Sequence, residues 1–282
     1  MQTPGYYRPE TMTEALDILA RGPVTLAAGC TDLFAATGAR ALPGPVLDIT
    51  GVDALRCATR DADGVHIGAA TTWSDLVAAD LPPAFDMLKQ AAVEVGSLQI
   101  QNAATLAGNI CNASPAADGA PCLLALDAEV ELASASGARR MPLAAFVTGP
   151  RQTALAPGEM VTGLHVPADA TRGISRFEKL GARRYLVISI AMVAARLVIE
   201  QGRIAGAAIA VGACSAVAVR LTALEAALIG APADARLAAV VTDALIRPAL
   251  APIDDIRADA AYRMDAAAEL VRRALAELVA GS

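Results

Sequence analysis

The sequence predicts a two-domain protein of the α+β class. In it, a two-part α/β domain precedes a smaller C-terminal domain built of an antiparallel sheet packed on helices. Three observations favour this. The 282 residues reach the size at which single hydrophobic cores stop growing. Short strands alternate with helices in the first half, and a Pro, Gly and Asp cluster at 157–172 precedes two long strands and a helix-rich end.

The predicted domain boundaries follow from this change of pattern. The first domain is placed at 1–168, with subdomains of about 1–55 and 56–168, and the second at 169–282.

Elements of the first domain are short and bounded by Gly, Pro or Asp. An apolar helical face after a Thr predicts a helix at Thr13–Arg21, and a buried strand is predicted at Val24–Ala28. The same reasoning predicts strands at Pro45–Thr50 and Val65–Ala69 and helices at Thr72–Ala79 and Phe85–Val95.

A polar stretch interrupts this alternation. The segment from Asn102 to Gly119 is rich in Gly, Asn and Ser and is predicted to be an interior loop. A helix at Cys122–Asp127 and an alternating strand at Ala128–Ala133 are predicted after it.

The C-terminal domain opens with long strands. Ser189–Glu200 and Arg203–Gly212 are predicted strands joined by the hairpin turn Gln201-Gly202. From Arg220 onward the Ala and Leu pattern is helical, and the last helix is predicted at Ala258–Ala280. We therefore expect a hairpin or three-stranded sheet backed by helices.

Composition excludes several classes of function. A net charge of -6 and scattered arginines argue against a nucleic-acid partner. The longest apolar stretch, Leu186 to Ile199, is too short to span a bilayer and contains Arg196. The start of the chain lacks the pattern of a signal peptide, and the five cysteines lack metal-binding spacing. A cytoplasmic location with reduced thiols is expected.

A first candidate site is the turn after the strand at 24–28. Gly29 allows close approach of the backbone, and small polar residues that can start a helix follow it, so unpaired amides there could bind a pyrophosphate. An ordinary strand-to-helix turn with an N-cap is the alternative. The candidate residues are Leu26, Ala27, Ala28, Gly29, Cys30, Thr31, Asp32 and Leu33.

The second candidate site is the polar segment 101–118, which gathers hydroxyls, amides and one carboxylate. Ordering so long a loop costs conformational entropy, and a ligand buried against it would offset that cost. The alternative is a surface loop whose Asn and Ser side chains satisfy its own turns.

Five sequence segments together resemble one family. The run A-A-G-C-T-D-L is followed by T-L-A-G-N-I-C-N-A-S-P-A-A-D, in the family's order and separation. Similarity extends to the segments Y-Y-R-P-E-T-M-T-E-A-L, F-E-K-L-G-A-R-R-Y-L-V-I-S and A-A-Y-R-M-D-A-A-A-E-L-V-R-R-A-L. The chain resembles, over nearly its whole length, the FAD-binding (medium) subunit of the xanthine dehydrogenase and carbon monoxide dehydrogenase family of molybdenum hydroxylases.

The resemblance implies a PCMH-type FAD-binding domain and assigns cofactor contacts. The first turn and Thr105–Gly108 would hold the FAD phosphates, and Asn109 to Ser114 would lie beside the flavin and ribityl chain. Asp118 would hydrogen-bond the cofactor, and Val161 and Lys179 would lie near it. The individual positions implied in 105–118 are Thr105, Gly108, Asn109, Cys111, Asn112, Ser114 and Asp118.

Lys179 carries a further hypothesis, because it is one of two lysines in the chain. A cation close to the flavin would stabilise the anionic reduced form and raise its reduction potential. The alternative is a solvated surface lysine.

Two positions depart from the family pattern. Gln101 stands where a basic residue is common, and Ala107-Gly108 stands where two glycines are usual. The added methyl of Ala107 is tolerable if that residue does not need a positive φ. Gln101 leaves the partner at its position open.

The remaining motifs are absent or weak. Rossmann, P-loop, zincin and α/β-hydrolase signatures are missing. His66 and His165 are expected to be structural or surface residues. Cys30 and Cys111 are expected to be small residues that lie beside a ligand, in preference to the alternative of a redox pair. No catalytic or metal-ligating residue is assigned to this chain.

The resemblance implies an electron relay. Partner subunits would carry the molybdenum cofactor (large subunit) and [2Fe-2S] clusters (small subunit), and FAD here would pass electrons to NAD, oxygen or another acceptor, in a dimer of heterotrimers. Two alternatives stay open: a self-sufficient FAD-dependent oxidoreductase, and a flavin-free assembly subunit.

Overall fold

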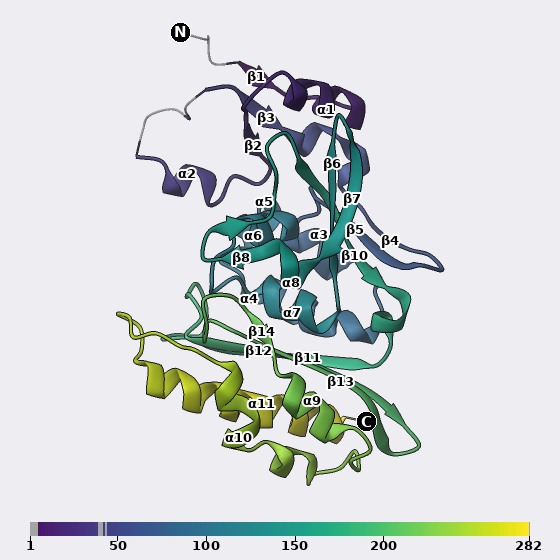
Figure 1. Cartoon of the computed structure of the whole chain (residues 1–282), viewed down its shortest axis with the longest axis vertical. Helices are drawn as coiled ribbons and strands as arrows, with labels where there is room; N and C mark the ends of the chain where they lie inside the picture. The colour runs from purple at the N-terminus through teal and green to yellow at the C-terminus, as the bar shows by residue number, and fades with distance from the viewer. Residues whose placement is uncertain (1–4, 39–41, 43, 282) are drawn as a thin grey trace.

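The computed structural model describes residues 5–38, 42 and 44–281. Figure 1 shows a small N-terminal layer at the top, a central layer of helices around one sheet, and a four-stranded sheet that separates this centre from the C-terminal helices. The fold belongs to the α+β class, as predicted.

A three-stranded parallel sheet opens the chain. Its order is β1 (Tyr6–Tyr7), β3 (Val46–Asp48), β2 (Thr25–Ala27). Helix α1 (Met12–Ala20) begins because the Thr11 side chain accepts a hydrogen bond from the Glu14 amide, and it buries Ala15. The short helix α2 (Leu33–Ala36) follows β2.

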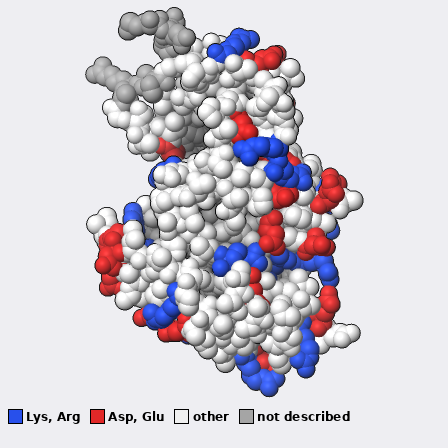
Figure 2. Space-filling model, viewed as in Figure 1, with Lys and Arg blue, Asp and Glu red and all other residues white. Residues whose placement is uncertain are grey.

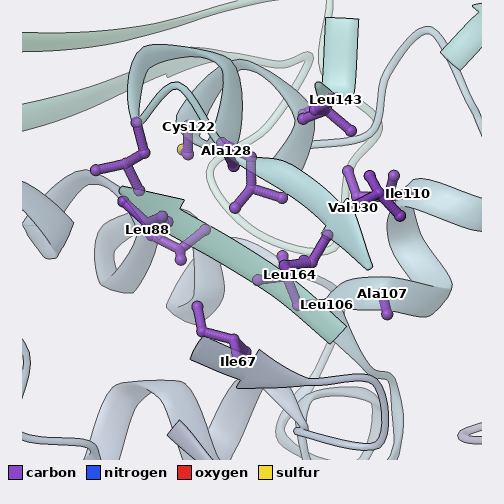
Figure 3. Packing of buried hydrophobic residues seen from close by; sticks show 14 of the residues in the cluster. Ile67, Leu88, Leu106, Ala107, Ile110, Cys122, Ala128, Val130, Leu143 and Leu164 are labelled. Carbon is purple, nitrogen blue, oxygen red and sulfur yellow. The ribbon is translucent and has the colours of Figure 1, made fainter. Parts of the chain in front are cut away.

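The central sheet is antiparallel, with five strands in the order β4-β5-β10-β6-β7. One face of it packs on helices, and the core between them is filled by side chains such as Ile67, Leu106 and Leu164 (Figure 3). The strands are β4 (Ala58–Arg60), β5 (Gly64–Gly68), β6 (Glu129–Ser134), β7 (Gly137–Pro142) and β10 (Met160–Pro167).

Six helices and a small hairpin accompany this sheet. They are α3 (Trp73–Ala78), α4 (Asp86–Glu94), α5 (Leu98–Ala103), α6 (Leu106–Cys111), α7 (Gly119–Ala125) and α8 (Leu143–Phe146), with strands β8 (Val147–Gly149) and β9 (Gln152–Thr153).

The C-terminal sheet has the order β11-β12-β13-β14 and is antiparallel throughout. Its strands are β11 (Ile174–Leu180), β12 (Ala191–Glu200), β13 (Arg203–Gly212) and β14 (Val219–Arg220). The helices beneath it in Figure 1 are α9 (Thr222–Leu228), α10 (Asp243–Ile246) and α11 (Ala260–Ala280).

Both faces of this sheet are buried, in different cores. Met192 and Ala194 of β12 pack with the helices of the central layer, whereas Ala191 and Val193 pack with α9 and α11. Because neighbouring side chains of a strand point to opposite faces, one strand contributes to two cores. This explains why β12 is apolar without alternation.

The structure corrects four sequence predictions. The segment from Asn102 to Gly119 is not one loop, since it contains the end of α5 and all of α6. The C-terminal sheet has four strands instead of two or three, and Arg220 lies in a strand instead of a helix. The helix predicted at Cys122–Asp127 begins earlier and ends at Ala125, because Asp127 adopts a positive φ of 48°.

Other predicted elements lie where they were expected, within a few residues at each end. No helix among the described residues is long and apolar enough to cross a membrane.

Candidate functional site

The turn after β2 exposes a run of unpaired amides. Within the described part of the chain, the amides of the four residues from Gly29 to Asp32 donate no hydrogen bond. Cys30 has a φ of 57°, a left-handed conformation that turns successive amides toward a common side. Such a turn can bind an anion.

Gly29 packs this turn directly against the end of α5. A Cβ on Gly29 would lie 1.9 Å from the carbonyl oxygen of Ala103 and 2.8 Å from the Cα of Ala104. Only glycine permits this approach. The two segments that sequence analysis proposed as phosphate-binding, 26–33 and 105–108, are therefore neighbours in space.

The start of α6 holds Thr105 and Gly108. The Thr105 hydroxyl accepts a hydrogen bond from the Gly108 amide at 3.0 Å. A Cβ on Gly108 would contact only this same hydroxyl, so the backbone of Gly108 is otherwise open to a ligand.

The asparagines of this segment are used differently. Asn109 Oδ1 accepts from the Gly119 amide at 3.1 Å, and this contact joins α6 to α7. Asn112 is held by Arg151, whose guanidinium donates to its side-chain oxygen and to its carbonyl.

Two further predicted residues lie in the same segment. Cys111, the last residue of α6, is exposed. Ser114 caps its own turn by accepting from the Ala116 amide.

A buried ion pair lies at the start of α7. Lys179 Nζ of β11 is 2.6 Å from Asp118 Oδ2, and the two side chains are 4% and 8% exposed. The Ser189 hydroxyl donates to Asp118 Oδ1 at 2.6 Å. Asp118 therefore does not cap α7 with its side chain; its two oxygens join the central layer to the C-terminal sheet.

A carboxyl group faces this pair from helix α4. Gln90 accepts from the Phe177 amide of β11, and Glu94 lies one helical turn further along the same face. Burial raises the pKa of Glu94, an effect that the charge of Lys179 opposes.

Predicted site residues line two separate cavities. Ala27 and Cys30 line one of about 440 Å³, beside Tyr6 and Asp48. Asn109 and Ser114 line another, of about 260 Å³, which is otherwise mostly apolar and reaches Ala216–Arg220. Val161 is buried in β10 at a register shift opposite β6.

The two departures from the family pattern have structural accounts. Gln101 donates from Nε2 to the carbonyls of Val93 and Val95, at 3.1 Å each, and so clamps the end of α4 to α5. Ala107 is buried inside α6 without a positive φ, so its methyl adds no backbone strain. Lys89, the other lysine, donates to the Ala79 carbonyl.

Sequence reasoning missed two residues. Ser189 and Arg151 each hold a predicted site residue, yet neither was assigned a role in the site; Ser189 appeared only as the last residue of the family-like segment F-E-K-L-G-A-R-R-Y-L-V-I-S. Ser189 carried a signal, because it is the lone hydroxyl in the apolar run from Leu186 to Met192. Arg151 carried none, since the fold alone brings it to Asn112.

The histidines form an unexpected pair on the outer face of the central sheet. His66 and His165 are register partners on β5 and β10. His66 Nδ1 is 2.7 Å from Glu131 and His165 Nδ1 is 3.2 Å from Glu129. Among the described residues, no three metal-ligating side chains are arranged to hold a metal ion.

On the face seen in Figure 2, acidic and basic side chains are intermixed.

The cysteines remain free thiols. All five are unpaired, and burial raises the pKa of the Cys30 thiol, which donates to the Ala28 carbonyl. A thiol with a raised pKa stays protonated at neutral pH and is a poor nucleophile.

These residues fit the chemistry of FAD. Free amides and an open glycine suit a pyrophosphate. An ionised carboxylate has about four acceptor positions, and the two protein donors on Asp118 leave positions for a hydroxyl of the cofactor.

Comparison with known proteins places this chain in a class. Residues 1–169 match the model of the FAD binding domain in molybdopterin dehydrogenase, and residues 176–278 match the CO dehydrogenase flavoprotein C-terminal domain. The chain belongs to this family of oxidoreductase flavoproteins, so the resemblance found in the sequence is confirmed.

Its relatives are dehydrogenase subunits. The chain is 28% identical to the xanthine dehydrogenase FAD-binding subunit of Escherichia coli O157:H7, over 98% of this chain and 96% of that protein. It is 27% identical to the carbon monoxide dehydrogenase medium chain of Hydrogenophaga pseudoflava, over 96% and 95%. Among solved structures, a chain of reconstituted CO dehydrogenase from Oligotropha carboxidovorans matches with a TM-score of 0.91 and 26% identity, covering 99% of each chain.

Proposed function

We propose that this chain is the FAD-binding electron-transfer subunit of a multi-subunit molybdenum hydroxylase. With FAD bound, it would take electrons from the [2Fe-2S] clusters of a small subunit and pass them to NAD, oxygen or another acceptor. A large subunit with the molybdenum cofactor would oxidise the substrate. The observation that carries the proposal is the contact of the 29–32 turn with the start of the 103–108 segment.

The residues of the chain bind and orient the cofactor, which supplies the redox chemistry when bound. The amides around Gly29 would bind the phosphates, and the missing side chain of Gly108 would let them approach the start of α6 closely. Asp118 would accept from the cofactor while Lys179 and Ser189 hold its carboxylate in place.

The remaining assigned contacts come from the resemblance. We propose that residues 109–114 and Val161 lie along the cofactor, the latter beside the bulge of β10.

The organisation of the complex extends the proposal. We place the FAD-binding domain at 1–168 and the C-terminal domain at 169–282, and we infer a dimer of heterotrimers in the cytoplasm. The core between the C-terminal sheet and its own helices supports a distinct C-terminal domain, while the other face of the sheet packs on the first domain. The free thiols agree with a reducing compartment.

The test is purification of the native complex through a tag on this chain. The absorption spectrum, the cofactor released on denaturation, and the co-purifying chains are then determined. FAD together with molybdenum and iron–sulfur subunits is the expected result. FAD without partners would indicate a self-sufficient flavoenzyme, and a folded chain without flavin would overturn both readings.

A further inference from the structure

Each oxygen of the Asp118 carboxylate accepts one hydrogen bond from a donor at the edge of the C-terminal sheet. Lys179 comes from β11, and Ser189 immediately precedes Ile190 at the start of β12. The Ile190 amide donates to the Leu180 carbonyl at 2.7 Å, so both donors stand at the closed base of the β11–β12 connection. Ser189 is 2% exposed.

The charges at this place balance. A buried carboxylate is stable only when it is paired and hydrogen-bonded, and Lys179 supplies the opposite charge at 2.6 Å. Ser189 adds no charge, but its hydroxyl fixes the second oxygen and withdraws part of the negative charge from it. Lys179 therefore does not act as a free cation; it acts as half of a neutral pair.

We propose that Ser189 is a positioning residue of the flavin site, which fixes Asp118 so that its carboxylate meets the cofactor in one orientation. This inference rests on the proposed function. It extends the site to a residue that contacts the cofactor only through Asp118.

Other charged groups near the Lys179–Asp118 pair would also influence the reduction potential of bound FAD as the pH changes. Glu94 faces it from α4, Glu178 adjoins Lys179 on β11, and Arg184 lies in the β11–β12 connection. The potential of bound FAD must therefore be measured over a range of pH values, so that these groups are separated from the effect of Ser189.

The direct test is Ser189→Ala in the full-length chain within its complex. Without the hydroxyl, the second oxygen of Asp118 is unpaired and more negative. Asp118 would then disfavour the anionic reduced flavin, so the reduction potential should fall across the pH range. The dissociation constant for FAD, measured by titrating the deflavinated protein with FAD, should rise at least about ten-fold, as loss of a buried charged hydrogen bond implies.

Ser175→Ala is the matched control. Ser175 is also buried on β11, and it also joins the two layers, by accepting from the Met87 amide and donating to the Pro83 carbonyl, both at 3.0 Å. Its loss should lower the thermal midpoint of the deflavinated protein much as Ser189→Ala does, without moving the FAD affinity or the potential. Ser189→Thr, which keeps the hydroxyl, should restore both.

The outcomes separate the two proposals. If wild-type protein binds no FAD, the proposed function fails before Ser189 is tested. If it binds FAD, but Ser189→Ala and Ser175→Ala give the same affinity and the same potential, or if the potential of Ser189→Ala rises, the role of Ser189 is overturned.

Discussion

Gly29 is the residue at which the two halves of the candidate site meet. A Cβ at this position would overlap the Ala103 carbonyl oxygen, so Gly29→Ala must move the turn or the end of α5. We expect at least a ten-fold loss of FAD affinity and about 1–3 kcal/mol of destabilisation, as overpacking usually causes. Fluorescence titration with FAD and urea unfolding measure the two effects.

Gly38→Ala is its control. Gly38 has no heavy atom of the described residues within 4 Å of a built Cβ, so FAD affinity and stability should both stay at wild-type values. Equal losses in the two variants would show that the contact with Ala103 does not matter.

Lys179 offers a test of charge pairing. Lys179→Met leaves Asp118 buried, with Ser189 as its remaining side-chain donor among the described residues. Breaking a buried pair from one side typically costs about 3–5 kcal/mol, and the flavin potential should fall because the negative charge is no longer balanced. Urea unfolding of the deflavinated protein and redox titration of the holoprotein measure these effects.

The double variant Lys179→Met with Asp118→Asn removes both charges. Much of the lost unfolding free energy should return, because no buried charge is left unpaired. Additive losses in the double variant would mean that the pair is not coupled as its geometry implies.

For single residues, the sequence predicts which residue types form a site better than it predicts which residues contact one another. The residue types of the two motifs marked them as candidate sites, and the resemblance to the family assigned the individual positions, whose contact with FAD stays a prediction. Ser189 and Arg151 could not, because their partners lie 71 and 39 residues away. Such pairings depend on how the sheet and α7 come together.

Helix α3 is stabilised by side-chain hydrogen bonds in its first turn. Thr72 and Asp75 form a reciprocal capping box, and Arg56 donates to both oxygens of Asp75 at 2.9 Å. The Arg56 guanidinium lowers the pKa of Asp75 to about 2. Asp75→Ala should cost about 1 kcal/mol at pH 7.

The pH dependence of this loss follows from the sign of the shift. The folded-state pKa of Asp75 lies below its unfolded value of about 3.9. Its stabilisation is therefore complete above pH 4 and disappears as the pH falls toward 2. Urea unfolding between pH 2 and pH 7 should show the two proteins converging at low pH. Asp80→Ala, at an exposed position, is the control, and it should change the free energy of unfolding little at any pH. If the loss in Asp75→Ala stayed unchanged at pH 2, the stabilisation would not come from the ionised Asp75 carboxylate.

Helices and strands could be predicted where their apolar residues recur regularly and where turn or capping residues mark both ends. Helices α1, α3 and α4 and the long hairpin β12–β13 follow from apolar spacing and turn residues. Helix α6 was missed because six residues that include Gly108 and Asn109 have weak helical propensity. It forms because Thr105 caps its start and the core takes Leu106 and Ile110.

At the scale of the whole molecule, α7 is clamped at both ends to the C-terminal sheet. Its start is held through Asp118, and its last carbonyls are capped by arginines. Arg196 Nε donates to the Ala125 carbonyl at 2.9 Å, and Arg220 donates to the Leu124 carbonyl at 2.9 Å. Asp127 accepts from both guanidinium groups. The sheet and the central layer should therefore unfold together.

Arg196→Met tests this clamp. The side chain of Arg196 is only 9% exposed, and its loss leaves the Ala125 carbonyl at the end of α7 without its donor. Arg220 still caps the Leu124 carbonyl in this variant, so only the hydrogen bonds of Arg196 are lost. We expect about 1.5–3 kcal/mol of destabilisation, as for hydrogen bonds to charged groups. Arg172→Ala, which removes an exposed pair with Glu200, should cost at most about 1 kcal/mol. Scanning calorimetry compares the variants, and equal thermal midpoints would argue against the clamp.

The fold class and the order of the elements were readable from the whole sequence. The way the two parts share one sheet was not readable. A largely apolar strand such as β12 indicates that both of its faces are buried, but it does not identify the elements that cover them.

That shared sheet has a consequence for how the protein is made. The ribosome completes residues 1–168 before β12 and β13 exist, so the helical face that Met192, Ala194 and Ala210 later cover is bare during synthesis. Exposed apolar surface of this kind promotes aggregation. The nascent chain must therefore be shielded by a chaperone, or elongate past Gly212 quickly, before its first half can settle into a stable structure.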